Sequence, residues 1–330
     1  MNRLLAGDPL AIALGELLPG GNPGSPPEEV ILEPLPSSRR VYRLVCTKSG
    51  VRAVGKFFLD HPPRSPADRG LVREYDNYLW AADLGLSTAE GLIPRLLGCR
   101  APVRLGLLLE AIPGPHLDQL MVQACVNGGG DLLYGALENL GRLLAIFHTR
   151  PLPKSPVSPD PALHYLDKLR GQLRELGLLT PEDEVALEQE RVAWEVRLGR
   201  FPERQVLIHG DATPTNFLFP QGRVVALDLE RLRMGDRLWD LSWVAGELKH
   251  AWGWRTGEMA RAEPYIRHLF SSYLNAVQAA PDLAQRLVLI NPLYMALAEL
   301  RIARNDYLPW DWRRALIGEA RRCLHFGRRM

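Results

Sequence analysis

The chain has 330 residues, of which 46% are apolar and 24% are charged, and this is the composition of an ordinary soluble protein. Forty Lys and Arg residues against 38 Asp and Glu residues leave a net charge of +2, which is too balanced to favour nucleic acid or a membrane surface as the main partner. The longest apolar stretch, residues 287–298, falls short of the roughly 20 residues that a membrane span needs, and the N-terminus shows no secretory signal. No feature of the sequence indicates an oligomeric state.

The four cysteines, Cys46, Cys99, Cys125 and Cys323, stand far apart in the sequence. None of them belongs to a Cys-x-x-Cys pair or to a Cys/His spacing of the kind that holds structural zinc. We therefore expect reduced thiols packed in apolar surroundings, as in a cytoplasmic protein.

The N-terminal third has the pattern of a β-rich region. Residues 1–27 are rich in Gly and Pro and are expected to form a loose lead-in. Residues 29–35, 41–46 and 52–58 follow as strands, with turn residues between the last two. Residues 68–84 show helical spacing and stop at Gly85, and residues 96–99 and 104–110 are two further strands.

The segment Ala111-Ile112-Pro113-Gly114-Pro115 ends this region, because neither a strand nor a helix continues through it. Beyond it the pattern is mainly helical, over residues 131–148, 163–176, 181–198 and again from Trp239. The sequence therefore predicts an α+β protein with two lobes. Residues 1–110 form a β-rich N-terminal lobe, and residues 111–330 form a helical C-terminal lobe.

The strongest chemical signal is the run from His209 to Asn216. A short apolar strand, residues 206–208, delivers His209-Gly210-Asp211 to a loop, and Asn216 stands five residues after Asp211. A second apolar strand then presents Asp228, with Glu230 two residues later. Each residue alone fits an ordinary turn or cap, but the joint spacing is typical of phosphoryl transfer from ATP. That reaction needs a carboxylate to orient the attacking hydroxyl and oxygen ligands to hold Mg²⁺ on the phosphates.

This segment resembles the catalytic and metal loops of the aminoglycoside phosphotransferase/choline kinase superfamily, the small-molecule relatives of protein kinases. The resemblance implies a bilobal protein-kinase-like fold and a nucleotide site for ATP with Mg²⁺. It implies Asp211 as catalytic base and Asn216, Asp228 and Glu230 as metal ligands. Residues 235–241 are similar to the family's Gly-Asp-Pro-x-x-Asp-Leu-Ala signature, which makes Asp240 a structural residue that tethers the catalytic loop.

The likeness extends to the N-terminal region. Lys56 matches the lysine that binds the nucleotide phosphates, and Glu74 matches its helical carboxylate partner. Backbone groups of Glu110 to Ile112 would then bind the adenine edge. His148 ends a helix that matches the family's Leu-x-x-Leu-His pattern, and we interpret it as a packing residue.

The weakest match is the loop expected to cover the nucleotide, residues 35–40, because it contains no glycine. Backbone N–H groups approach phosphates most closely where glycine is present. Ser37 and Ser38 would offer hydroxyls instead, while a plain hairpin turn explains the segment equally well. This departure keeps open an alternative function, a catalytically weak or non-catalytic nucleotide-binding pseudokinase with a scaffolding or regulatory role.

The acceptor carries no signature in the sequence. Residues 231–330 contain 16 Lys or Arg against 10 Asp or Glu, which favours a neutral or anionic acceptor over a polycationic one. Alternatively, Trp252, Trp254, Trp310 and Trp312 could form an aromatic cage for a quaternary ammonium acceptor. When two tryptophans stand two residues apart, however, one is more often packed and the other partly exposed. The terminal arginines are interpreted as a solvated helix face, with contact to RNA or acidic lipid as a third alternative.

The sequence thus predicts an ATP-dependent phosphotransferase that moves the γ-phosphate to a hydroxyl of a small molecule. No nucleic-acid partner and no membrane span are expected. Asp211 would be the base, Lys56 and Glu74 would serve the phosphates, and Asn216, Asp228 and Glu230 would serve Mg²⁺.

Overall fold

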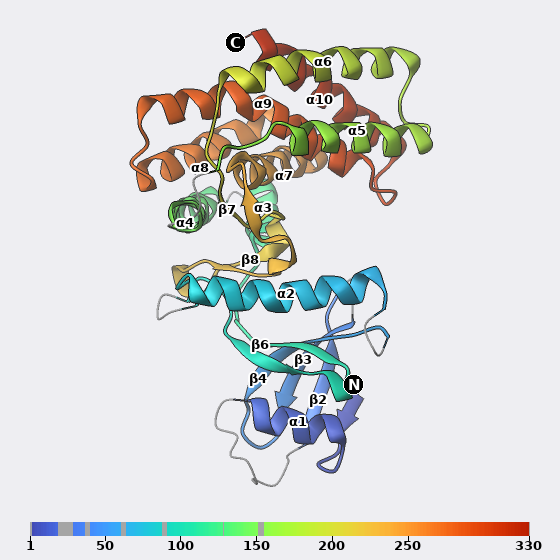
Figure 1. The fold of residues 1–330 in the computed structure, drawn as a ribbon, viewed down its shortest axis with the longest axis vertical. Coiled ribbons are helices and arrows are strands. Elements are labelled where there is room, and N and C mark those ends of the chain that lie inside the picture. The colour runs from blue at the N-terminus through green and yellow to red at the C-terminus, as the bar shows by residue number, and fades with distance from the viewer. Residues whose placement is uncertain are drawn as a thin grey trace. The chain divides into compact units, whose positions relative to one another are not determined.

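The computed structural model describes residues 2–18, 29–36, 40–60, 64–87, 91–127, 129–150 and 155–329. These fall into two compact units, one of Met1–Gly114 with Val225–Leu232 and one of Pro115–Val224 with Arg233–Met330. The first unit is built on a sheet and the second is mainly helical (Figure 1), which confirms the predicted α+β class with a β-rich N-terminal part. The segment 225–232 belongs to the first unit, although the sequence prediction assigned it to the C-terminal lobe.

The first unit contains a six-stranded antiparallel sheet in the order β1-β2-β3-β4-β6-β5. Its elements are β1 (Asn2–Leu4), α1 (Pro9–Leu17), β2 (Val30–Pro34), β3 (Arg40–Cys46), β4 (Arg52–Phe57), α2 (Pro66–Asp83), β5 (Leu96–Arg100), β6 (Leu105–Glu110) and β9 (Val225–Ala226). Two short 3-10 turns, η1 (Ala101–Val103) and η4 (Leu229–Arg231), complete it.

The expectation of a loose lead-in over residues 1–27 is wrong for residues 2–18. β1 pairs with β2, and α1 begins where the Asp8 side chain accepts a hydrogen bond from the Leu10 N–H, with Pro9 in the first turn. Leu14 is fully buried in the core between α1 and the sheet. The Gly- and Pro-rich stretch that suggested a loose segment follows α1, and residues 19–28 lie outside the described part of the chain.

Helices α1 and α2 lie on opposite faces of the sheet (Figure 1). In β4, Ala53 and Phe57 belong to the core under α1. Because side chains alternate along a strand, Lys56 points to the other face, where α2 lies. The pleat of β4 therefore positions a charged residue against a helix.

The second unit is a helical domain with short strands (Figure 1). Its elements are α3 (Leu117–Asn127), α4 (Gly130–Thr149), α5 (Asp160–Glu175), α6 (Pro181–Arg200), β7 (Val206–Ile208), β8 (Phe217–Leu218), β10 (Arg233–Gly235), α7 (Leu238–Thr256), α8 (Glu263–Ala276), α9 (Pro281–Ala303) and α10 (Trp310–Arg329), with 3-10 turns η2 (Pro214–Asn216), η3 (Pro220–Gly222) and η5 (Met259–Ala262). α4 packs on α8, and α9 packs on α7 and α10. α7 is buried on almost every side, which makes it the central helix of the unit.

The basic residues of α10 do not form a purely solvated face. Arg314 and Arg321 both form ion pairs with Asp183 at the start of α6, and Arg328 pairs with Glu190 of the same helix. Much of the positive charge that the sequence shows near its end is therefore used in packing α10 against α6.

The four cysteines are free thiols, as the sequence predicted. None of the described helices combines the length and the apolarity that crossing a membrane requires.

Candidate active site

In the first unit, Lys56, Glu74 and Asp228 lie together. The Lys56 Nζ is 2.7 Å from Oε1 of Glu74 on α2 and 3.3 Å from Oδ1 of Asp228, which follows β9. Lys56 is 8% exposed and Glu74 is fully buried. Burial alone would lower the pKa of Lys56, but the carboxylates of Glu74 and Asp228 outweigh it and raise that pKa above its ordinary value. The ammonium is therefore charged at any physiological pH.

Asp228 occupies a distinctive backbone position. It has φ 56° and ψ 68°, the left-handed region, where a residue other than glycine is strained. The turn that follows is fixed to α2, because the side chain of Asn77 donates a hydrogen bond to the carbonyl of the buried Leu229 at 2.6 Å. Glu230 lies in this turn, and its side chain is paired with Arg231 at 3.5 Å. The carboxylate of Asp228 is thus held by its ion pair with Lys56 and by the anchored turn that follows it.

The end of β6 carries the residues expected to meet adenine. The Glu110 N–H is already used, because it donates to the carbonyl of Arg95 at 3.0 Å. The Ile112 N–H has no hydrogen-bond partner among the described residues and is the better candidate for a base contact. Ser37 and Ser38 lie outside the described residues.

In the second unit, the loop of residues 209–216 begins where β7 ends, and Asp240 in the first turn of α7 holds it. The Asp240 carboxylate accepts hydrogen bonds from the His209 N–H at 2.8 Å and from the Gly210 N–H at 2.9 Å. Gly210 has φ 77°, a conformation that glycine adopts without strain. These two bonds confirm the predicted tether and fix the direction in which the loop leaves the strand.

Asp240 also belongs to a buried hydrogen-bond chain. The His148 Nε2 lies 3.1 Å from the Asp240 carboxylate, the His148 Nδ1 lies 2.9 Å from the Tyr273 hydroxyl, and Arg237 donates to that hydroxyl at 2.8 Å. Burial lowers the pKa of His148 more than Asp240 raises it, so the ring is neutral and donates from Nε2. The interpretation of His148 as a packing residue is therefore incomplete, because it positions Asp240.

Asp211 and Asn216 lie within the loop itself. The Asn216 amide N–H donates to the Asp211 backbone carbonyl at 2.9 Å, and the Thr213 N–H donates to the same carbonyl at 2.7 Å. The bond from Asn216 uses its side-chain nitrogen, so its Oδ1, the atom that would bind a metal ion, does not take part in that bond. The structure brings Asp211 together with Asn216 in one unit and Lys56 together with Asp228 in the other.

Sequence reasoning missed a second support for the loop, the ion pair of Asp236 with Arg286. Both side chains are buried, Asp236 also accepts from the Leu238 N–H at 3.0 Å, and Tyr294 donates to it at 3.1 Å. The pair therefore joins the start of α7 to α9. Only one member of the pair could be identified from the sequence, because Asp236 stands in the Gly-Asp signature whereas Arg286 lies 50 residues away and belongs to no motif.

Next to the loop, the second unit contains a pocket of about 290 Å³. It is lined by Asp118 and Met121 of α3, Pro214 of the loop, Glu247, His250, Ala251, Trp254 and Arg255 of α7, and Tyr307 and Leu308. The Oδ1 of Asp118 is buried and has no hydrogen-bond partner among the described residues. Sequence reasoning missed Asp118, because α3 has no motif of its own.

The four tryptophans do not form one cage. Trp252 is buried beside Tyr265, with ring centroids 4.6 Å apart, and Trp254 contacts Trp312 at 5.8 Å. Trp254 lines the pocket, while Trp310 is 52% exposed. The pocket thus offers one indole and the Tyr307 ring.

Two ionisable groups of the pocket have shifted pKa values. Burial raises the pKa of Glu247, although Arg301 beside it acts in the opposite direction. Burial lowers the pKa of His250 to about 4, helped by Arg255 and Arg301, so this ring is neutral and its Nδ1 accepts from the Trp312 indole N–H at 3.1 Å. Of the two carboxylates that line the pocket, Glu247 is paired with Arg301, whereas Asp118 has no ion-pair partner among the described residues.

Several solved structures share this fold. Choline kinase from Cryptosporidium parvum Iowa II has 12% identity and a TM-score of 0.59, over 96% of this chain and 93% of that chain. Ethanolamine kinase from Plasmodium vivax has 12% identity and a TM-score of 0.58, over 90% of this chain and 81% of that chain. Aminoglycoside phosphotransferase APH(2'')-Ib, solved with ADP, has 15% identity and a TM-score of 0.57, over 89% and 94%.

No curated protein sequence matches the chain. The sequence model of the phosphotransferase enzyme family, APH, matches residues 32–283, which is most of the chain. The match confirms the resemblance seen in the catalytic and metal loops. The chain belongs to the phosphotransferase enzyme family.

Proposed function

We propose that the protein transfers the γ-phosphate of ATP to a hydroxyl group of a small molecule. Family membership supports a small-molecule phosphotransferase. The observation that carries the ATP-dependent reaction is the buried ammonium of Lys56 between Glu74 and Asp228. A buried cation is expensive unless it has a task or a partner, and here two carboxylates hold it in one place. A positive charge fixed in this way suits the α- and β-phosphates of a nucleotide.

Asp211 is the proposed base. Asp240 accepts hydrogen bonds from the N–H groups of His209 and Gly210, so the fold fixes the backbone that leads into Asp211. In this role the carboxylate accepts the proton of the acceptor hydroxyl as the oxygen attacks the γ-phosphorus. Because the transition state is loose, the contribution of Asp211 is mainly orientation of that hydroxyl.

The donor atoms fit Mg²⁺. Asp228 offers a carboxylate and Asn216 offers an amide oxygen, which are the hard oxygen ligands that this ion prefers. When bound, Mg²⁺ neutralises negative charge on the phosphates. Glu230, two residues after Asp228, is a further candidate ligand, and its carboxylate lies 3.5 Å from Arg231. For the adenine edge, the Ile112 N–H is the proposed donor. The hydroxyls of Ser37 and Ser38 are proposed from the sequence alone to meet the phosphates in place of the missing glycine.

We propose that the acceptor binds in the pocket beside the loop. At about 290 Å³ the pocket lies at the lower end of the range for ligand sites, about 300–1,000 Å³, which favours a molecule of about one ring over a multi-ring aminoglycoside. The basic excess of residues 231–330 had favoured a neutral or anionic acceptor. The pocket does not share that excess, and the buried oxygen of Asp118 favours an acceptor that donates a hydrogen bond, such as an amino alcohol or a sugar.

The test is an ADP-release screen with Mg-ATP against amino alcohols, monosaccharides and aminoglycosides. We expect turnover with a one-ring or acyclic acceptor, and we expect Asp118→Asn to raise KM for an amine-bearing acceptor by about tenfold or more while kcat changes little. Asp282→Asn, an exposed carboxylate on α9, is the matched control. Equal KM values in wild type and Asp118→Asn would remove Asp118 from the acceptor site.

The second candidate function is nucleotide binding without turnover, and the glycine-free segment at residues 35–40 favours it. It predicts a thermal shift with Mg-ATP and no ADP release with any acceptor in the screen. That pair of results would replace the proposed activity with a scaffolding or regulatory role.

A further inference from the structure

A second hollow in the helical unit is larger than the acceptor pocket. It is a groove of about 730 Å³ lined by α7, α8, α9 and α10, and it shares no lining residue with the pocket of about 290 Å³. We call it the α8 groove. Its volume lies well inside the range of sites for small organic molecules, about 300–1,000 Å³.

The walls of the α8 groove are apolar. On α8, Ile266, Phe270 and Leu274 recur at every fourth residue and line it, while the neighbouring face, with Leu269 and Tyr273, packs against α4 at Gly141. α8 thus presents a second apolar stripe to the groove, in which Ile266 is buried and Phe270 and Leu274 are partly exposed. At the groove, Val288 of α9 is 56% exposed and Phe326 of α10 is 61% exposed. Apolar surface gathered in a hollow marks a binding site more than single exposed side chains do.

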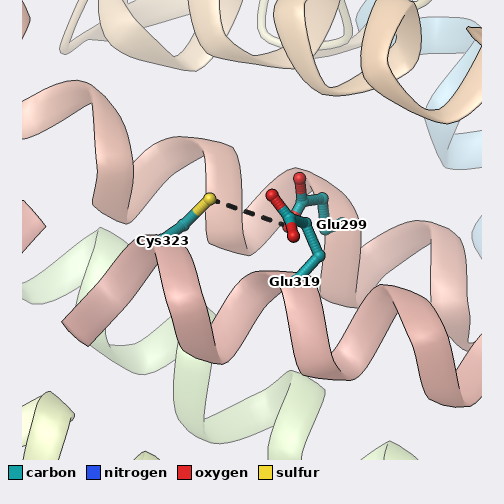
Figure 2. A group of neighbouring side chains, drawn as sticks. All are labelled: Glu299, Glu319 and Cys323. Carbon is teal, nitrogen blue, oxygen red and sulfur yellow. Dashed lines mark hydrogen bonds between the residues drawn. The ribbon is translucent and has the colours of Figure 1, made fainter. Parts of the chain in front are cut away.

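The floor of the α8 groove is polar. Lys249 of α7 forms an ion pair with Glu319, and its Nζ lies 3.7 Å from the buried Glu299 and 3.8 Å from the Sγ of Cys323. Figure 2 shows Glu299, Glu319 and Cys323 converging from α9 and α10. A metal ion is not the occupant that this cluster suggests. The Lys249 ammonium already neutralises it, and burial raises the pKa of the Cys323 thiol, which keeps it protonated and a poor ligand.

The charges that line the α8 groove favour an anion. Three basic side chains, Lys249, Arg267 and Arg322, face two acidic ones, Glu263 and Glu319. Lys249 and Arg322 are both engaged with Glu319. Arg267 is exposed on the α8 wall and has no ion-pair partner among the described residues. It is therefore the cation that can meet an incoming negative group.

We propose that the α8 groove binds a free single-chain carboxylate amphiphile of the fatty-acid type, with its chain along the apolar walls and its carboxylate on Arg267. The hollow accounts for a flexible apolar chain, and the exposed guanidinium of Arg267 accounts for the sign of the head group. The site lies on the side of α7 that presents Lys249, whereas the neighbouring His250 faces the acceptor pocket.

The test is direct binding, so it does not depend on turnover or on the identity of the acceptor. Octanoate, decanoate and dodecanoate are titrated as monomers into the full chain by calorimetry. We expect Kd to fall by about fourfold for each added methylene. Decyltrimethylammonium, which has the opposite head-group charge, is expected to bind at least about tenfold more weakly than decanoate.

Two matched pairs of variants locate the site. Val288→Glu should abolish decanoate binding, whereas Val185→Glu, at an exposed valine of α6, should not. Arg267→Gln should weaken decanoate about tenfold or more and leave decanol unchanged, whereas Arg261→Gln, a basic residue that does not line the groove, should have no effect. Calorimetric titration of a folded variant, checked by circular dichroism, separates loss of binding from loss of fold.

The proposal is overturned by no heat with any carboxylate below its critical micelle concentration, by equal affinity for the cationic amphiphile, by decanoate binding that survives Val288→Glu, or by binding only to anionic vesicles. A concentration-dependent dimer that Val288→Glu dissociates would assign the groove to a second copy of the chain and would also overturn it.

Discussion

Replacing Asp240 with asparagine removes one charge and keeps the shape of the side chain. The carboxylate accepts three hydrogen bonds, from the N–H groups of His209 and Gly210 and from the His148 ring, at 2.8, 2.9 and 3.1 Å. Asparagine has one oxygen where Asp240 has two, so its amide nitrogen would face at least one donor. The variant therefore tests whether this residue holds the catalytic loop.

The magnitude follows from the lost acceptor. A hydrogen bond to a charged acceptor contributes about 1.5–3 kcal/mol, and an N–H left without a partner costs about 1–3 kcal/mol more. Relief from burying an ionised carboxylate offsets part of this, so we expect Asp240→Asn to lower the free energy of unfolding by about 2–4 kcal/mol. Because the loop that carries Asp211 then loses its direction, we expect kcat to fall by about 100-fold.

The assay combines urea unfolding with ADP release at a temperature where every variant is folded. Asp282→Asn, an exposed change of the same chemistry, is the control and should stay within about 0.5 kcal/mol of wild type. An Asp240→Asn variant that unfolds at the wild-type urea concentration and turns over at the wild-type rate would refute the account of the tether.

The same residue predicts a pH dependence. Burial alone would raise the pKa of Asp240, but His148, His209 and the Gly210 N–H outweigh it and place that pKa below its ordinary value. A carboxyl with a depressed folded pKa contributes stability above its unfolded pKa, about 4, and this stability is lost as the pH falls further. As the pH falls below about 4, the free energy of unfolding should therefore decrease less in Asp240→Asn than in wild type.

Three further predictions concern buried ionisable groups. Lys56→Met leaves Glu74 buried without its cation and should lower the free energy of unfolding by about 3–5 kcal/mol. The double variant Lys56→Met/Glu74→Leu should recover most of this stability but should not recover the Mg-ATP thermal shift. A double variant no more stable than Lys56→Met would contradict this reasoning. His250, with a pKa of about 4, should lower the free energy of unfolding by at most about 3 kcal/mol as the pH falls from about 6.5 to 4. In urea titrations, His250→Asn should lose less stability than wild type over this pH range. Glu299, with a pKa raised by burial to about 8, should make stability fall as the pH rises from about 4.5 to 8. The advantage of Glu299→Gln over wild type should therefore be about 3 kcal/mol larger at pH 9 than at pH 6, and equal advantages at the two pH values would contradict this.

The sequence predicted elements that carry a strong local signal. The strand at 41–46 and the helix at 181–198 agree with β3 and α6 within two residues, because alternation and the Thr180-Pro181 start are local features. Helices α1 and α3 were missed. α1 stands beside a Gly- and Pro-rich stretch that suggested a loose segment, and α3 follows a proline-rich break without a motif.

The residues of the candidate site likewise fall into those that a local pattern predicts and those that only the folded structure brings together. Residues with a fixed spacing, such as Asp211 with Asn216, were found from the sequence, and so was the Lys56–Glu74 pair through the family resemblance. Contacts between distant residues were not found, because neither the partnership of Asp236 with Arg286 nor the burial of Asp118 leaves a local trace. Summed charge was also misleading, since Arg314 and Arg321 serve Asp183 and do not face a ligand.

The central claim is that Asp211 is the base of a phosphoryl transfer from ATP. The most direct measurement compares ADP release by wild type and Asp211→Asn with the best acceptor of the screen, alongside the Mg-ATP thermal shift of both proteins. We predict that Asp211→Asn lowers turnover by about 100-fold to 10,000-fold and leaves the thermal shift unchanged. Turnover close to that of wild type in Asp211→Asn would contradict the mechanism.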